Sequence, residues 1–146
     1  MRLFYLMETG VSKPDAVWSR GVITEHPLTD IGELMTNQDC KIALILIRQN
    51  VSMQRGIREL IFFIVTDSCF GQKKIRENVF ASVIPSLDAV TEFVRPDDIV
   101  CGRASEEMEK FLKELAMEGI ETHCIKDEEE IHEIFGVSSK VRKAGS

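Results

Sequence analysis

Apolar and polar positions follow their clearest pattern in the last third of the chain. Residues 99–102 form a short apolar run that ends in a glycine, which is typical of a buried strand in a parallel sheet. Apolar residues then recur at helical spacing as far as Gly119, after Ser105 in the position of an N-cap. The side chains of residues 120–125 form two alternating sets, which is typical of a strand nearer the sheet edge. Residues 127–136 have an N-capping residue and apolar residues at helical spacing, which predicts a second helix. This region therefore predicts a strand, a helix, a strand and a helix.

Two apolar segments further upstream also predict strands. Residues 41–47 are apolar on both faces, which indicates a strand at the centre of a sheet. Residues 58–66 are ambiguous: their aromatic and β-branched side chains favour a strand, whereas Ile61 and Ile64 also fit a helix face. We favour the strand. Since residues 48–57 are too few for a crossover helix, which needs about a dozen residues or more, the two strands are expected to be antiparallel.

The simplest fold class is α/β, with a mixed sheet. A three-strand antiparallel meander over residues 17–23, 41–47 and 58–66 is followed by the β-α-β-α unit, as in the ribonuclease H-like architecture. Residues 3–7 are a further, weaker strand candidate, and residues 86–94 have the spacing of a helix after a proline.

A flavodoxin-like doubly wound parallel sheet is the alternative fold. It follows if residues 52–68 are helical and residues 79–84 form a strand. In either fold we expect one α/β domain over residues 1–136 and a flexible basic tail over residues 137–146.

Three segments carry a resemblance to a known family: the run from Asp98 to Gly102, the run from Phe111 to Leu115, and Gly119-Ile120-Glu121. With them, residues 41–135 resemble the dinitrogenase iron–molybdenum cofactor-binding family, whose fold is ribonuclease H-like. The resemblance implies a protein that holds a metal cofactor. The family usually has a His-Phe-Gly segment before its second strand, where this chain has Arg55-Gly56-Ile57.

Composition and charge exclude several classes of protein. The net charge of -6 and the isoelectric point near 5.1 argue against nucleic acid as a partner. No apolar run approaches the about 20 residues that a bilayer-spanning helix needs, so we expect no membrane partner. Glu8 interrupts the apolar N-terminal stretch where a signal peptide would continue, which predicts a cytoplasmic protein.

An anion site is the first candidate for chemistry. Gly102, Arg103 and Ser105 follow a predicted strand and open a predicted helix, where free backbone N–H groups attract a phosphate or carboxylate. The alternative is that Gly102 makes a tight turn and Ser105 only caps the helix. The glycine-rich and nucleophile motifs of nucleotide-binding proteins and hydrolases are absent.

The four cysteines are the second candidate. If the meander begins at residues 17–23, the topology brings four distant thiols to one sheet edge, and thiolates are the ligands that zinc and iron–sulfur clusters prefer. If it begins at residues 41–47, the thiols separate. The alternative is four reduced, structural thiols, because a domain of this size needs no disulfides. The four residues are Cys40, Cys69, Cys101 and Cys124.

These observations predict a small cytosolic binding or accessory protein. Its strand-end loops would hold a small anionic ligand or a metal cofactor, such as zinc or an iron–sulfur-type cluster. An enzyme with a flavodoxin-like fold, acting on a phosphorylated or carboxylate small molecule, is one alternative. A homo-oligomeric interaction module, for example a homodimer, is another.

Overall fold

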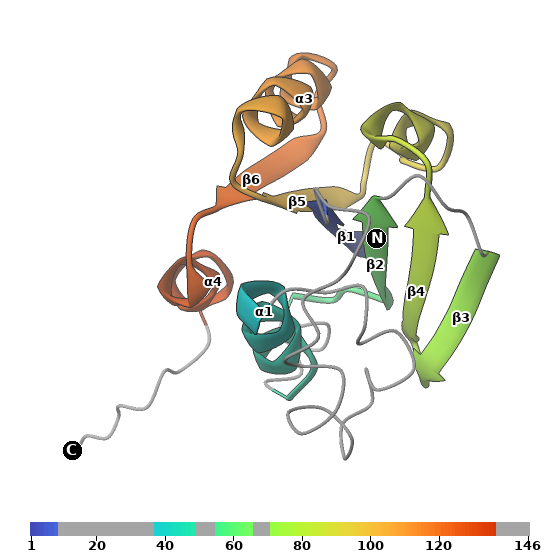
Figure 1. Ribbon diagram of the computed structural model, residues 1–146, viewed down its shortest axis with the longest axis vertical. Coiled ribbons are helices and arrows are strands. Elements are labelled where there is room, and N and C mark those ends of the chain that lie inside the picture. Colours follow the sequence, from blue (N-terminus) through green and yellow to red (C-terminus); the bar gives the residue numbers. More distant parts are fainter. Residues whose placement is uncertain (9–36, 49–54, 66–70, 137–146) are drawn as a thin grey trace.

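The computed structural model describes residues 1–8, 37–48, 55–65 and 71–136 (Figure 1). Strands and helices alternate along most of this part of the chain. The elements are β1 (Arg2–Glu8), α1 (Asn37–Arg48), β2 (Glu59–Val65), β3 (Gly71–Arg76), β4 (Val79–Ile84), the 3-10 helix η3 (Leu87–Glu92), β5 (Ile99–Arg103), α3 (Glu106–Met117), β6 (Glu121–Ile125) and α4 (Glu128–Phe135).

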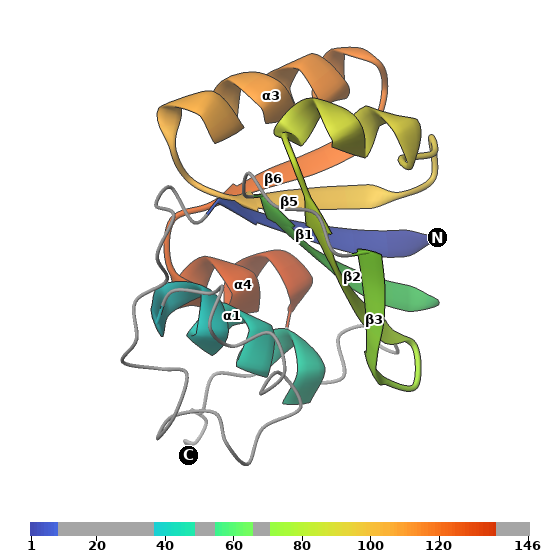
Figure 2. The same ribbon diagram turned by 45° about the vertical axis from the view of Figure 1, so that its right-hand side comes forward.

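The strands form one mixed six-stranded sheet with the order β3-β4-β2-β1-β5-β6. Every neighbouring pair is parallel except β3 and β4, which are antiparallel. Helices α1 and α4 cover one face of the sheet, and α3 and η3 cover the other (Figure 2). The expected α/β class with a mixed sheet is therefore confirmed. Among the described residues, no helix has the length and apolar character needed to cross a membrane.

The expected strand over residues 41–47 is wrong, because this segment is part of helix α1. Ile42, Ala43, Leu46 and Ile47 are buried at the i, i+1, i+4 and i+5 positions of one helix face. Leu44 and Ile45, which lie between them, are only half-buried. Because these two residues are also apolar, the sequence shows no helical alternation of apolar and polar positions.

The expected antiparallel meander is wrong as well. Its third member, residues 58–66, is confirmed as strand β2, but β2 is parallel to β1. Helix α1 lies between these two strands in the chain. The connection from β1 to β2 therefore includes a helix and is long enough for a parallel crossover. The expected strand over residues 17–23 lies outside the described residues.

The flavodoxin-like alternative agrees with the structure in one strand and differs in its helix and its strand order. Its strand over residues 79–84 is confirmed as β4, but residues 59–65 are extended and not helical. Numbered along the chain, the five parallel strands β1, β2, β4, β5 and β6 have the order 3-2-1-4-5. A flavodoxin-like sheet has the order 2-1-3-4-5.

The expected β-α-β-α unit is confirmed as β5, α3, β6 and α4. The Ser105 hydroxyl oxygen accepts a hydrogen bond of 3.1 Å from the Met108 N–H, which caps α3. The Asp127 carboxylate caps α4 in the same way, with the Glu130 N–H at 3.2 Å. The expected tail over residues 137–146 lies outside the described part of the chain.

Strand β1 lies at the centre of the sheet and is buried on both faces. Leu3, Tyr5 and Met7 pack toward α1 and α4, whereas Phe4 and Leu6 pack toward α3 and η3. This double burial explains why the segment is a nearly continuous apolar run, in which no alternation marks a strand.

Candidate functional site

The topology of the sheet places a crevice at the carboxyl ends of its parallel strands. In open α/β sheets, ligands bind at this edge, next to the point where the strand order reverses. Here the chain adds β2 and β4 on one side of β1, and β5 and β6 on the other. The reversal point therefore lies between the end of β1 at Glu8 and the end of β5 at Arg103.

Glu8 is held beside the first turn of α3. The Ser105 hydroxyl lies 3.2 Å from Oε1 of Glu8 and donates a hydrogen bond to it. Burial raises the pKa of Glu8, and a hydrogen bond with the Glu107 carboxyl raises it further, whereas the bond from Ser105 lowers it. Two carboxyl groups form a hydrogen bond only when one of them is protonated, which is why this contact favours the protonated form of Glu8.

A cavity of about 520 Å³ opens beside Glu8, on the sheet face covered by α3 and η3. Its volume lies within the range of roughly 300–1,000 Å³ that is usual for small-molecule sites. Four of its lining residues are acidic and one, Lys110, is basic, so its charge is predominantly negative. The lining residues are Glu8, Val65, Pro85, Ser86, Leu87, Asp88, Glu107, Lys110, Phe111 and Glu114.

Neither a scan against protein-family models nor searches of curated proteins and of solved structures found a match for this chain. The resemblance of residues 41–135 to the dinitrogenase iron–molybdenum cofactor-binding family stays a prediction. The functional inference therefore rests on the residues around Glu8 at the carboxyl ends of the strands.

Arg103 points to the opposite face of the sheet from Ser105. Its Nη1 lies 3.3 Å from Oδ2 of Asp39, which is almost completely buried in the first turn of α1. The Tyr5 hydroxyl donates a hydrogen bond of 2.9 Å to Oδ1 of the same carboxylate, and burial, followed by Asp39, raises the pKa of Tyr5. The anion site stays a prediction, and both of its polar side chains already contact a carboxylate.

The third residue of that prediction, Gly102, is required for packing. A Cβ atom at this position would lie 2.6 Å from Cγ of Met108, whose side chain is fully buried under α3. The close approach of β5 and α3 is therefore a sufficient reason for glycine here.

The structure places two of the four cysteines on opposite faces of the sheet. Cys101 is buried on the face covered by α1 and α4, and burial raises the pKa of its thiol. Cys124 is half-buried on the opposite face, against α3. Cys40 lies within α1 and not at the start of a strand, and Cys69 lies outside the described residues. The meander that would bring the four thiols together is therefore wrong, and the metal site itself stays a prediction. No group of three or more metal-ligating side chains gathers in the described part of the chain.

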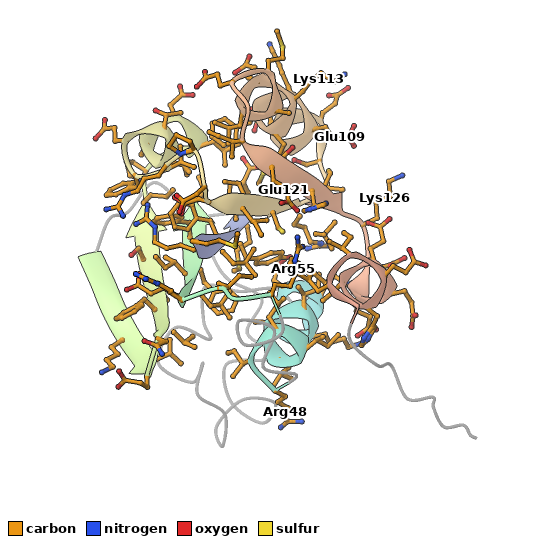
Figure 3. All side chains as sticks on the ribbon, turned by 180° about the vertical axis from the view of Figure 1, so that it is seen from behind. Arg48, Arg55, Glu109, Lys113, Glu121 and Lys126 are labelled. Carbon is orange, nitrogen blue, oxygen red and sulfur yellow. The ribbon has the colours of Figure 1, made fainter. Side chains whose placement is uncertain are left out.

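A second polar cluster lies on the edge strand β6 and was missed at the level of sequence. Oε2 of Glu121 lies 2.6 Å from Nε2 of His123 and 3.4 Å from Nη2 of Arg55, and the hydrogen bond with His123, more than any other contact, lowers the pKa of Glu121 (Figure 3). The spacing of two residues on a strand predicts that Glu121 and His123 share a face, but no local signal places Arg55 beside them.

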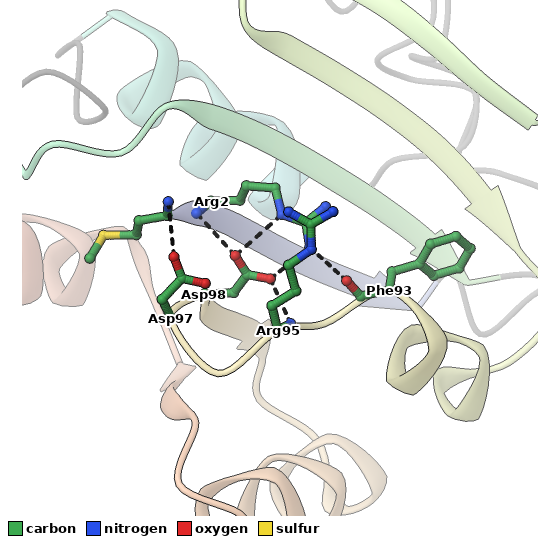
Figure 4. Close-up of polar contacts among 6 residues, drawn as sticks. Arg2, Phe93, Arg95, Asp97 and Asp98 are labelled. Atoms are coloured by element: carbon green, nitrogen blue, oxygen red, sulfur yellow. Dashed lines mark hydrogen bonds and ion pairs between the residues drawn. The ribbon is translucent and has the colours of Figure 1, made fainter.

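The opposite end of β1 carries a network of a different kind (Figure 4). Asp98 is buried, and its carboxylate accepts hydrogen bonds from the backbone N–H, Nε and Nη2 of Arg2 and from the backbone N–H of Arg95. Nη2 of Arg2 also donates to the Phe93 carbonyl at 2.6 Å. This carboxylate is fully compensated, which is typical of a structural role.

Proposed function

We propose that this protein binds a small polar organic molecule in the cavity at the carboxyl ends of β1, β2 and β4. The ligand presents a hydroxyl or ammonium group to the Glu8 carboxyl. This proposal keeps the expected binding of a small molecule at strand-end loops. It changes the expected chemistry of the ligand, from an acceptor of hydrogen bonds to a donor.

The pairing of Glu8 with Glu107 is the observation that carries the proposal. Both groups are acceptors once they are ionised, and the two carboxylates then repel each other. A ligand that brings a donor between them relieves that repulsion and gives both carboxylates a hydrogen-bond partner. The partial burial of Glu8 strengthens such a bond, because the local dielectric is lower than that of water.

The charge of the cavity lining favours the same class of ligand. Asp88 and Glu114 add two further carboxylates around the cavity, and Lys110 is its single cation among the lining residues. An anion would meet repulsion from four acidic groups. An amine or a sugar hydroxyl would find acceptors on several sides.

A thermal-shift experiment with four probes tests the proposal. Putrescine and arginine methyl ester supply ammonium groups, adenosine supplies ribose hydroxyls, and inorganic phosphate at equal ionic strength supplies an acceptor only. We expect at least one of the first three to raise Tm by several degrees, since a ligand at a hundred times its Kd adds about 2.7 kcal/mol of stability. Phosphate should have no specific effect.

Two variants locate the effect. Glu8→Gln should abolish the Tm shift, because it removes the negative charge and replaces one acceptor oxygen with an NH2 group, which only donates. Glu118→Gln is the matched control, since Glu118 is exposed at the end of α3 and does not line the cavity. Stabilisation by phosphate alone, or a shift that survives Glu8→Gln, would overturn the proposal.

A further inference from the structure

The two edges of the sheet are protected to different degrees. Edge strands expose unpaired backbone groups, and proteins protect them with lysines, prolines and bulges. Strand β3 has the exposed Lys74, and its pairing with β4 shifts register between Lys74 and Arg76. Strand β6 has no lysine, no proline and a regular register with β5 throughout Glu121–Ile125. Among the described strands, β6 pairs only with β5.

The outward backbone groups of β6 can be assigned. The Ala104 N–H donates to the Ile125 carbonyl at 2.8 Å, so the backbone of Ile125 is directed toward β5. Alternate residues of a parallel strand are directed to opposite neighbours. The N–H and C=O groups of Thr122 and Cys124 are therefore directed away from β5, toward the open edge.

A shallow hollow of about 350 Å³ runs beside this edge, between β6 and α3. Helix α3 leaves Thr122 and Cys124 only half-buried, so it does not extend over the edge. Figure 3 shows Glu109 and Lys113 on the flank of α3 that faces this side. The hollow is lined by Glu109, Leu112, Lys113, Thr122, Cys124 and Lys126.

We propose that the β6 edge is the interface with a second copy of this chain. The two β6 strands pair in antiparallel fashion about a two-fold axis at His123, which joins the two sheets into one. In this register Thr122 of each copy lies opposite Cys124 of the other. Each such pair exchanges two backbone hydrogen bonds, and the five-residue strands overlap completely.

Charge complementarity on α3 supports a second copy as the occupant. Met108 of α3 packs on Gly102, which is the partner of Cys124 in the β5–β6 register. His123 lies one residue, about 3.3 Å, back along β6, and at about 1.5 Å per residue the same distance along the antiparallel helix reaches the level of residue 110. Glu109 and Lys113 lie on either side of that level. The two-fold axis therefore brings Glu109 of each copy opposite Lys113 of the other.

The spacing of the layers permits this arrangement. Helix α3 packs on both β5 and β6, and neighbouring strands lie about 4.8 Å apart. Pairing two β6 strands therefore separates the two copies of α3 by about 10 Å, which is within the usual distance for packed helices. The hollow beside each β6 strand is then covered by the other copy.

The oligomeric state of the full chain, measured by size-exclusion chromatography with light scattering over a range of protein concentrations, tests the proposal. We expect a dimer that dissociates on dilution. Thr122→Pro removes an outward N–H without breaking the ladder to β5, so it should raise the dissociation constant about tenfold or more. Circular dichroism checks that the variant is folded. A monomer at every concentration would overturn the proposal.

Charge reversal separates this interface from any other. Glu109→Lys or Lys113→Glu alone places like charges across the axis and should weaken the dimer. The double reversal restores complementarity and should restore the dimer. Lys110→Glu, on the other flank of α3, is the control and should leave the dimer unchanged. A dimer that is indifferent to all of these variants would place the interface elsewhere and overturn the proposal.

Cross-linking tests the register. His123→Cys places two thiols across the axis, at a position where the Cα atoms of an antiparallel pair lie about 4.5 Å apart, which a disulfide can span. Mild oxidation should produce a covalent dimer on a non-reducing gel, beyond any product of the native cysteines. Lys110→Cys should produce none. Equal cross-linking of the two variants would contradict this register.

Discussion

The two ends of strand β1 hold a carboxylate in opposite ways. At the amino end, Asp98 accepts four hydrogen bonds from Arg2 and Arg95, and its charge is compensated by a guanidinium group 2.8 Å away. At the carboxyl end, Glu8 lies beside a second carboxyl, that of Glu107, and its pKa is raised. One end of the strand pairs its carboxylate with a cation, and the other places two carboxyl groups side by side with the Ser105 hydroxyl as donor.

This difference separates a structural site from the proposed binding site along the same strand. A buried group whose hydrogen-bond partners are all in place contributes to stability and has no hydrogen-bonding capacity left for a ligand. A group with a perturbed pKa beside a cavity costs stability and retains the capacity to bind, which is the usual signature of a functional site. The sheet topology leads to the same end of β1, because ligands bind at the carboxyl ends of parallel strands.

Removing the amino-end carboxylate should have the largest effect. Asp98→Ala leaves the Arg2 guanidinium partly buried without its charge partner and the Arg95 N–H without an acceptor, so we expect a loss of about 3 kcal/mol in the free energy of unfolding. Urea denaturation measures it. Asp97→Ala is the control, because Asp97 is exposed and its ion pair with the terminal amine lies in solvent, and stability should barely change. Equal losses in both variants would contradict the comparison.

Substitution of Gly102 should have an intermediate effect at the carboxyl end. The added methyl group of Gly102→Ala collides with Met108 in a fully packed layer, and overpacking of this kind costs about 1–3 kcal/mol. The double variant Gly102→Ala, Met108→Ala tests the cause. Its loss in unfolding free energy should be smaller than the sum of the two single losses. Additive losses would show that the contact with Met108 is not what requires glycine.

Glu8→Gln should have the smallest effect on stability, and its sign should be opposite to that of Asp98→Ala. The folded-state pKa of Glu8 lies above the ordinary value of 4.5, so the wild type loses stability as the pH rises from that value through the raised pKa. The glutamine variant should lack this loss and gain less than about 1 kcal/mol at pH 7, since solvent screens a half-exposed pair.

Unfolding curves between pH 4 and pH 8 measure this difference. Glu107→Gln removes the other member of the pair and should reduce the same pH dependence. Identical pH profiles in the wild type and the Glu8→Gln variant would show that the pair creates no electrostatic strain at this end of the strand.

The local signals of the C-terminal third were sufficient to predict its structure. Ser105 and Asp127 cap helices because their side chains reach backbone N–H groups three residues ahead, a geometry that depends on nothing distant in the chain. The apolar spacing in α3 and α4 marks one buried face for the same reason. The strand over residues 58–66 was also predicted, from the poor helix propensity of its aromatic and β-branched residues.

Helix α1 shows where such signals fail. A run of six apolar residues from Ile42 to Ile47 is compatible with a helix or with a strand, since the period is lost when both faces are apolar. Only packing against the sheet selects the face that holds Ile42 and Leu46. The antiparallel meander was wrong as a consequence, and with it the topology on which the four-cysteine hypothesis rested.

The candidate site divides in the same way. By itself the sequence determined that Glu8 ends an apolar run, that Gly102 ends another and that Ser105 opens a helix, because these are properties of neighbours in the chain. The tertiary structure decided that Glu8 meets Glu107, that Arg103 is directed to Asp39 on the other face, and that Cys101 and Cys124 lie on opposite sides of the sheet. These relations depend on strand order and on the face of the sheet that each residue occupies. Both follow from burying the whole set of apolar segments at once, which no single segment encodes.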